Sequence, residues 1–192
     1  RAARALAGAE QVRVALLYSN PSASYLSELL MGALQQASLS HVHLIVEQCE
    51  FAVDEFAVIR RLVNSGIGGF ILPPPLCDEQ SLLDLLSELG ACAVAVGPGD
   101  KPARHSAVMI DEQRAACDMT RHIIALGHRR IGFIIGNPQQ SASAQRLAGY
   151  RAALEEAGIP VEPDLIAQGQ FTYRSGLAAA ERLFARPQIP TA

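Results

Sequence analysis

The sequence lacks the features that would direct it to a membrane, a metal or a redox reaction. None of its apolar runs approaches the roughly 18 residues that a membrane helix needs, and its N-terminus has no apolar signal-peptide centre. Its four cysteines form no CxxC pair and have no histidine at metal-ligand spacing. We therefore expect a soluble, cytoplasmic protein without metal or membrane partner, whose thiols are small buried apolar side chains: Cys49, Cys77, Cys92 and Cys117.

A strong net charge and the common catalytic motifs are missing as well. The formal charge of −3 over 192 residues gives no overall basic field, so any contact with nucleic acid must be local. No GxGxxG or GxxxxGKS/T pattern follows an expected strand, and no Ser/His/Asp or Cys/His set is visible. These absences predict that the protein is not an enzyme, has no catalytic residues and needs no cofactor.

Short apolar segments alternate with segments of helical period along the whole chain, and 49% hydrophobic residues suffice for a sizeable core. We expect strands at 12–18, 42–49, 68–72, 92–97, 107–111, 130–136 and 165–169, and helices at 25–38, 54–66, 80–89, 112–126, 144–157 and 175–185. Continuous apolar strands separated by helices predict an α/β fold with doubly wound parallel sheets. Ligands of such sheets bind at the loops that follow the carboxyl ends of the strands.

The ends of the expected helices support this division. Asp54 is a candidate N-cap, and Gly66 and Gly127 are candidate C-terminal stops. We interpret the basic cluster at 128–130 as a group that satisfies the last carbonyls of a helix, and not as a catalytic or phosphate site. The helix at 25–38 carries its apolar residues on one face: Leu26, Leu29, Leu30, Ala33, Leu34 and Ala37.

The long polar stretch between Gly97 and Ala107 indicates a junction between two subdomains. We place the crossover near Asp111, with a first subdomain at 9–110 and a second at 111–192. The second subdomain is expected to be incomplete, because one strand and one helix remain after Gly158 and the chain stops where another strand would start. Residues 1–8 form a separate basic and alanine-rich linker.

Several motifs give the chain a resemblance to a known family. They are RAARALAG, NPSASYLSELLMGAL, GGFILPPP, VMIDEQRAACDMTRHIIALGHRRIGFIIG and QRLAGYRAALEEAGI, and they cover nearly the whole chain in order. With them the chain resembles the LacI/GalR family of bacterial transcriptional repressors, whose core is shared with periplasmic sugar-binding proteins. The resemblance implies a two-subdomain, periplasmic-binding-protein-like (type I) fold that is truncated at both ends, since the helix-turn-helix and the last strands and helices are missing.

The same resemblance implies a function in gene regulation. A small effector would bind between the subdomains of a homodimer and change its binding to operator DNA through the missing helix-turn-helix and the hinge. Residues 1–8 match the family's hinge helix, and Leu6 matches the leucine that enters the minor groove. A periplasmic sugar-binding protein of a transport system is the alternative.

Two charged residues are the first candidates for the effector site. A guanidinium at the expected start of the helix 144–157 can donate paired hydrogen bonds to hydroxyls or to a carboxylate, and in the family Arg146 touches the effector. Asp111 ends an expected strand, where it could accept from a sugar hydroxyl or a ring nitrogen. The alternatives are a solvated arginine and an N-cap.

Polar and aromatic residues of the same loops complete the candidate set. Amide and hydroxyl groups supply neutral donors and acceptors, and an aromatic face stacks on a sugar or base. The alternatives are a surface loop for the polar residues of 140–143, a first core residue for Tyr25, and a turn role for the pair before Pro21. The candidates are Gln140, Ser141, Ser143, Phe171, Tyr25, Ser19 and Asn20. This neutral set favours a sugar or glycoside over an anion, and a nucleoside would also fit.

Overall fold

The structure, a computed structural model, describes residues 12–192 in two compact units that divide between Val108 and Met109. This division lies close to the expected subdomain boundary at Asp111. Each unit has its own parallel sheet and its own helices. The hinge segment 1–8, with Leu6, lies outside the described residues, so its expected role stays a prediction.

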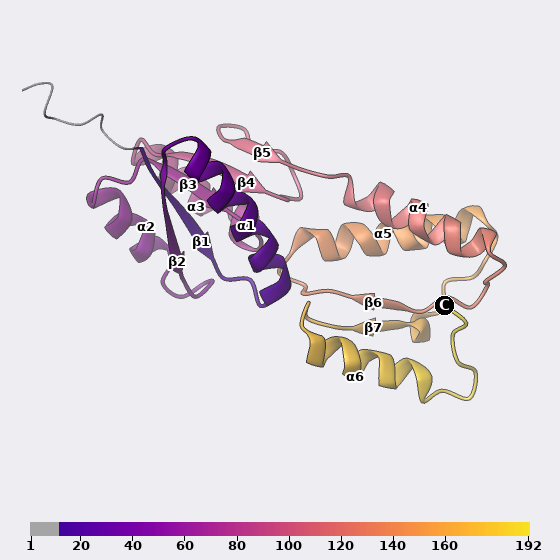
Figure 1. Cartoon of the computed structure of the whole chain (residues 1–192). Coiled ribbons are helices and arrows are strands. Elements are labelled where there is room, and N and C mark those ends of the chain that lie inside the picture. Colours follow the sequence, from indigo (N-terminus) through magenta and orange to yellow (C-terminus); the bar gives the residue numbers. More distant parts are fainter. Residues whose placement is uncertain (1–11) are drawn as a thin grey trace, which may run out of the picture. The chain divides into compact units, whose positions relative to one another are not determined.

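The first unit contains a five-stranded parallel sheet in the order β2-β1-β3-β4-β5 (Figure 1). Its strands are β1 (Arg13–Tyr18), β2 (His43–Gln48), β3 (Gly69–Leu72), β4 (Cys92–Val96) and β5 (Ser106–Val108). The chain builds β2 on one side of β1 and then crosses to the other side to build β3. The loops after β1 and β3 therefore meet at a switch point, where doubly wound sheets bind ligands.

The core of the first unit lies on the face of the sheet that carries α2 (Glu55–Asn64) and α3 (Gln80–Glu88). Buried leucines and isoleucines of these helices pack against alternate strand residues such as Phe70 and Ala95. The 3-10 helix η2 (Leu76–Asp78) adds Leu76 and Cys77 to the same cluster.

The opposite face of this sheet carries α1 (Ala23–Leu39), none of whose residues is buried. Leu29, Ala33 and Ala37 line a groove against strand residues such as Ile71 and Val94, whereas Leu34 is 52% exposed. The apolar face predicted for 25–38 therefore exists, but only part of it contacts the sheet.

The second unit is built from α4 (Glu112–Ala125), β6 (Phe133–Ile135), α5 (Ser141–Glu156), η3 (Pro163–Leu165), β7 (Ile166–Gln168) and α6 (Tyr173–Phe184). Strands β6 and β7 pair in parallel, α4 and α5 lie side by side on one face, and α6 covers the other (Figure 1). Tyr150 is the buried centre of this unit: its ring lies 4.9 Å from that of Phe133 and its hydroxyl donates to the Ile131 carbonyl at 2.8 Å.

Gly149 lets α4 and α5 approach closely. A Cβ at this position would lie 2.0 Å from the carbonyl oxygen of Gln113 and 2.9 Å from the backbone nitrogen of Cys117. Both atoms belong to the backbone of α4 and cannot rotate away. No side chain larger than hydrogen fits here unless the two helices separate.

Three expectations from the sequence need correction. The helix α5 begins at Ser141 and not at Ala144, so Arg146 lies in its second turn and not at its start. The helix α6 begins at Tyr173, because Thr172 and Ser175 form a reciprocal capping box. Cys92, the first residue of β4, is exposed, unlike the other three thiols.

The structure also bears on membrane insertion and on helix ends. Within residues 12–192, no helix combines the length and the apolar character needed to cross a lipid bilayer. Gly66 and Gly127 adopt positive φ values of 85° and 96° directly after their helices. Arg129 donates to the Ile124 carbonyl of α4 at 3.0 Å, which confirms the helix-end interpretation for this residue alone. Arg130 instead donates to Glu162 and to the Gln188 carbonyl, and His128 contacts the Thr191 hydroxyl.

Candidate functional site

The switch point of the first unit holds two of the predicted site residues. The Asn20 amide donates to the Pro74 carbonyl at 3.1 Å and accepts from the Ser22 amide at 2.8 Å. The Ser19 hydroxyl accepts from the Phe51 amide at 3.0 Å. Both side chains therefore tie the loop after β1 to the loops after β3 and β2. This supports a structural role beside the predicted contact with an effector.

A pocket of about 460 Å³ opens beside this loop, at the carboxyl ends of β1 and β2. Ser19, Asn20, Gln48 and Cys49 line it together with acidic residues of the loop before α2. Burial and the carboxylates of Asp54 and Glu55 raise the pKa of Cys49 to about 12. The thiol therefore stays protonated and lacks the reactivity of a nucleophile.

Tyr25 belongs to the first turn of α1, where its amide donates to the N-cap hydroxyl of Ser22 at 3.3 Å. Its side chain is 36% exposed, so it is not the core residue that the alternative interpretation assigned.

The second unit brings together Arg146, Phe171 and a residue that the sequence did not single out, Glu112. The Arg146 guanidinium donates to both carboxylate oxygens of Glu112, from Nε at 2.6 Å and from Nη2 at 2.9 Å. Its Cζ lies 5.8 Å from the centre of the Phe171 ring, within the range of a cation–π contact. The three residues come from α5, from the loop after β7 and from the first position of α4.

Arg146 is neither a free cation nor a fully solvated side chain. Its side chain is 43% exposed and that of Glu112 is 12% exposed. The hydrogen bonds that Arg146 donates to Glu112 raise the pKa of Arg146 above its ordinary value, while partial burial opposes this rise. The bidentate pair fixes the orientation of the guanidinium plane and leaves the Nη1 edge without a partner in Glu112.

Phe171 is held by the backbone around it. Its ring lies over Gly136, where a Cβ would approach Cζ of the ring to 2.0 Å. Phe171 itself has a φ of 57°, a left-handed conformation that costs a non-glycine residue roughly 1 kcal/mol or more. The Gln168 amide donates to the carbonyls of Gly136 and Gly169, both at 2.6 Å, and so joins the loops after β6 and β7.

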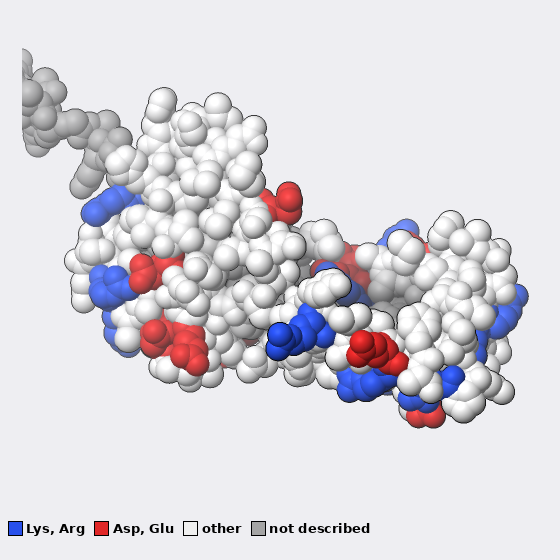
Figure 2. Space-filling view, turned by 60° about the horizontal axis from the view of Figure 1, so that its bottom comes forward, with Lys and Arg blue, Asp and Glu red and all other residues white. Residues whose placement is uncertain are grey.

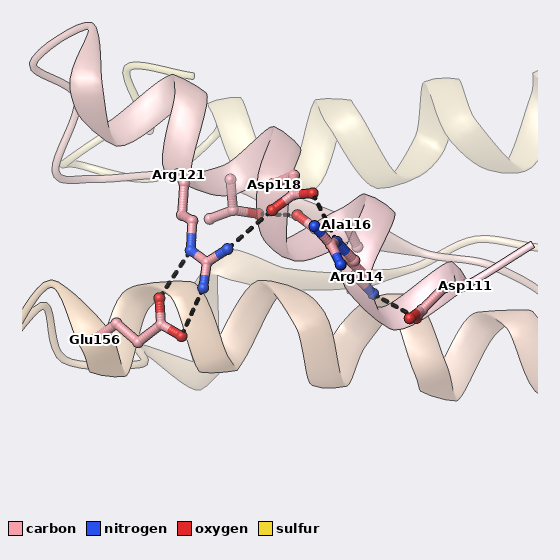
Figure 3. Close-up of polar contacts among 7 residues, drawn as sticks. Asp111, Arg114, Ala116, Asp118, Arg121 and Glu156 are labelled. Carbon is pink, nitrogen blue, oxygen red and sulfur yellow. Dashed lines mark hydrogen bonds and ion pairs between the residues drawn. The ribbon is translucent and has the colours of Figure 1, made fainter.

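Asp111 is the N-cap of α4, because its carboxylate accepts from the Arg114 amide at 2.9 Å. Figure 3 shows this contact at the start of the helix, together with the ion pairs of Asp118 and Arg121 further along it. The capping role that the sequence offered as an alternative is thus present. An additional contact of Asp111 with an effector stays a prediction.

The polar loop after β6 contains the last predicted residues. Gln140 is the N-cap of α5, is 5% exposed, and its Nε2 has no hydrogen-bond partner among the described residues. Ser141 is the first residue of α5. The Ser143 hydroxyl donates to the Asn137 carbonyl at 2.6 Å and is buried. Ser143 therefore closes the loop onto the helix, while Gln140 keeps an unused donor.

Sequence analysis missed Glu112 and Gly136, which orient Arg146 and support Phe171. Each acts on a residue more than thirty positions away in the chain, so no local pattern marks it. Glu112 could be recognised in the sequence as an acidic residue in the first turn of a helix. Such a residue is usually explained by its favourable interaction with the helix dipole, so it did not indicate a binding site.

Charges are mixed over the described surface. On the face in Figure 2, basic and acidic side chains alternate with broad uncharged areas in both units, and no continuous basic patch is visible there. This distribution agrees with the absence of an overall basic field in the sequence.

Two parallel α/β units with polar residues at the carboxyl ends of their strands define a class of small-molecule-binding proteins. Comparison with known families identifies the family within this class to which the chain belongs. The chain belongs to the family of periplasmic binding proteins and sugar-binding domains of the LacI family, whose sequence profile matches residues 11–192.

Individual relatives agree with this assignment. The chain is 27% identical to catabolite control protein A of Priestia megaterium over 99% of its own length and 58% of that protein. It is 28% identical to the HTH-type transcriptional regulator DegA of Bacillus subtilis, over 99% of its own length and 57% of that protein. It thus spans less than two thirds of these relatives, both of which carry names of regulatory proteins.

A solved structure gives the same result for the fold. The transcriptional regulator CelR in complex with cellobiose superimposes with a TM-score of 0.79 at 27% identity, over 98% of this chain and 61% of that one. The doubly wound, periplasmic-binding-protein-like fold predicted from the sequence is therefore confirmed.

Proposed function

We propose that this chain is the effector-sensing core of a LacI-type transcriptional repressor and that its effector is an uncharged small molecule, a sugar or glycoside in the first place. The observation that carries this proposal is the Arg146 guanidinium held beside the Phe171 ring at the carboxyl ends of β6 and β7. A polar donor beside an aromatic face suits a ring with hydroxyls on its edge. Asp111, Gln140, Ser141, Tyr25, Ser19 and Asn20 are the further candidate contacts.

Related proteins support both parts of this proposal. DegA and CelR are named as transcriptional regulators, catabolite control protein A is named as a control protein, and the similar CelR structure contains cellobiose. We extend these properties to the present chain: binding of operator DNA by a homodimer in the cytoplasm, and a change in that binding when the effector is present. The coupling requires that the effector has different affinities for two arrangements of the protein.

The test uses the gene product that contains this sequence. A thermal-shift screen of mono- and disaccharides and of nucleosides should identify a ligand, and titration calorimetry should show that R146A and F171A weaken its binding by roughly tenfold or more. The matched control is R151A, which removes an exposed arginine from the same helix and should bind like wild type. Equal affinity of R146A and wild type would contradict the proposed site.

A DNA-binding measurement separates regulation from transport. The gene product should retard an operator fragment from its own upstream region, and the identified ligand should change the affinity for that fragment. A protein that binds a sugar but no DNA would instead be a binding protein of a transport system.

A further inference from the structure

We propose that Glu112 determines the ligand specificity of the site at Arg146 and Phe171. By neutralising the charge of Arg146, Glu112 makes the site accept an uncharged ligand and reject an anion. This inference rests on the proposed function, because it concerns the ligand of the same site. It goes beyond that function because it assigns the choice between ligand classes to one residue, which lies on a different helix from the arginine.

The geometry of the pair is the first step. A guanidinium carries five N–H donors, and Glu112 engages one on Nε and one on Nη2. This is the side-on fork that a ligand carboxylate or phosphate would otherwise occupy. Glu112 therefore takes the position of an anionic ligand on this edge and leaves three N–H donors, on Nη1 and Nη2, whose positive charge it already balances. These donors suit hydroxyl or carbonyl oxygens.

Burial is the second step. The Glu112 side chain is 12% exposed, so water screens its charge less than that of a surface carboxylate. An anion at the remaining Nη1 edge would lie close to this carboxylate and would be repelled by it. The neighbouring Asp111 is also acidic, and its carboxylate is occupied by the Arg114 amide.

A second ion pair between the same helices argues against a purely structural role for Glu112. Arg121 of α4 donates to both carboxylate oxygens of Glu156 of α5, at 2.8 Å and 2.9 Å (Figure 3). It already fastens the far ends of the helices with the same chemistry. What distinguishes the Glu112 pair is its burial and its position under an aromatic ring.

The experiment measures binding of inorganic phosphate to the whole protein. The NMR signals of the arginine Nε–H groups report directly on Arg146, and phosphate is compared with chloride at equal ionic strength. Wild type should show no phosphate-dependent change at Arg146. E112Q, which keeps the size of the side chain and removes its charge, should bind phosphate roughly tenfold more tightly or better. Adding R146Q to E112Q should abolish this gain.

Two variants control for effects on folding and for nonspecific effects. E112D keeps the negative charge and should exclude phosphate like wild type, which separates charge from packing. E156Q removes the same kind of partner from the other arginine and should leave the Arg146 signal unchanged. If E112Q failed to fold, E112A would take its place, because it also removes the charge and keeps the Arg146 signal.

The possible failures are distinguishable. Phosphate binding to Arg146 in wild type, or equal binding in wild type and E112Q, would overturn the role of Glu112 even if a neutral effector were found. Gain of phosphate binding by E112Q together with no response to any sugar or nucleoside would support charge compensation and overturn the proposed function.

Discussion

The two ends of the α4–α5 helix pair carry the same chemical group in two different environments. At one end Arg146 and Glu112 form a bidentate pair that is partly buried and lies beside Phe171. At the other end Arg121 and Glu156 form a bidentate pair whose side chains are 51% and 52% exposed. The same bidentate chemistry is thus partly buried at one end and exposed at the other, and only for the Arg146 end do we propose a role in ligand selection.

The difference shows that environment, and not bond length, decides what an ion pair can do. Water screens an exposed pair and competes for its hydrogen bonds, so such pairs contribute little to stability. A partly buried pair keeps more of its Coulomb energy and also fixes a donor in one orientation. Gly149, which lies between the two pairs on α5, lets the helices approach closely enough for both pairs to form.

The largest effect on stability is expected from a substitution of Gly149. G149A places a Cβ 2.0 Å from the backbone of α4, so the helices must separate and the free energy of unfolding should fall by about 3 kcal/mol. Urea denaturation followed by circular dichroism measures this change. G176A is the matched control, because a Cβ there meets nothing within 4 Å and a helical glycine-to-alanine change should stabilise by about 0.5 kcal/mol. If G149A were as stable as wild type, the conclusion that α4 and α5 pack too closely for a Cβ at position 149 would be wrong.

An intermediate effect is expected from double-mutant cycles on the two pairs. The cycle of E112A with R146A should give a coupling energy of about 1 kcal/mol, a value reduced for solvent screening because Arg146 is 43% exposed. The cycle of R121A with E156A should give a smaller coupling, because both side chains are about half exposed. Thermal and urea denaturation at low and high salt measure both cycles. Equal couplings would show that burial does not separate the pairs.

The smallest effect is expected from acid titration of the exposed pair. Hydrogen bonds from Arg121 lower the pKa of Glu156 below its ordinary value of 4.5. A carboxylate with a lowered pKa stabilises the fold above its unfolded pKa and loses this contribution as the pH falls through its folded pKa. The small difference in melting temperature between wild type and E156Q should therefore be present at pH 7 and disappear below about pH 4. A difference that grew on acidification would contradict this assignment.

The fold could be predicted from the sequence because its signals are local. Alternating apolar strands and helical periods identified each described β-strand and α-helix, and glycines marked the helix ends at Gly66 and Gly127. The 3-10 helices η2 and η3 were not predicted, and β5 ends at Val108 and not at Asp111 as expected. Errors arose where a local preference was outweighed by a neighbour. The serines at 141–143 were interpreted as loop residues, but they form the first turn of α5, where such residues also satisfy backbone groups.

The candidate site could be predicted only in part. Arg146 and Phe171 were predicted, and the structure places them together. Their relation to Glu112 and Gly136 depends on contacts between elements far apart in the chain, which no periodicity encodes. The exposure of Cys92 and of α1 was missed for the same reason, because an apolar pattern shows which face is apolar but not how completely it is covered.

The hydrogen bonds of the Gln168 side chain have a consequence for the rate at which a ligand binds. Its amide donates to the Gly136 and Gly169 carbonyls and so ties together the segments that follow β6 and β7. If the proposed effector stacks on Phe171, loops that are already tied together lose little conformational freedom on binding. The association rate of the ligand with this unit would then be limited by the frequency of collisions in the right orientation, and hardly by a conformational change of the protein.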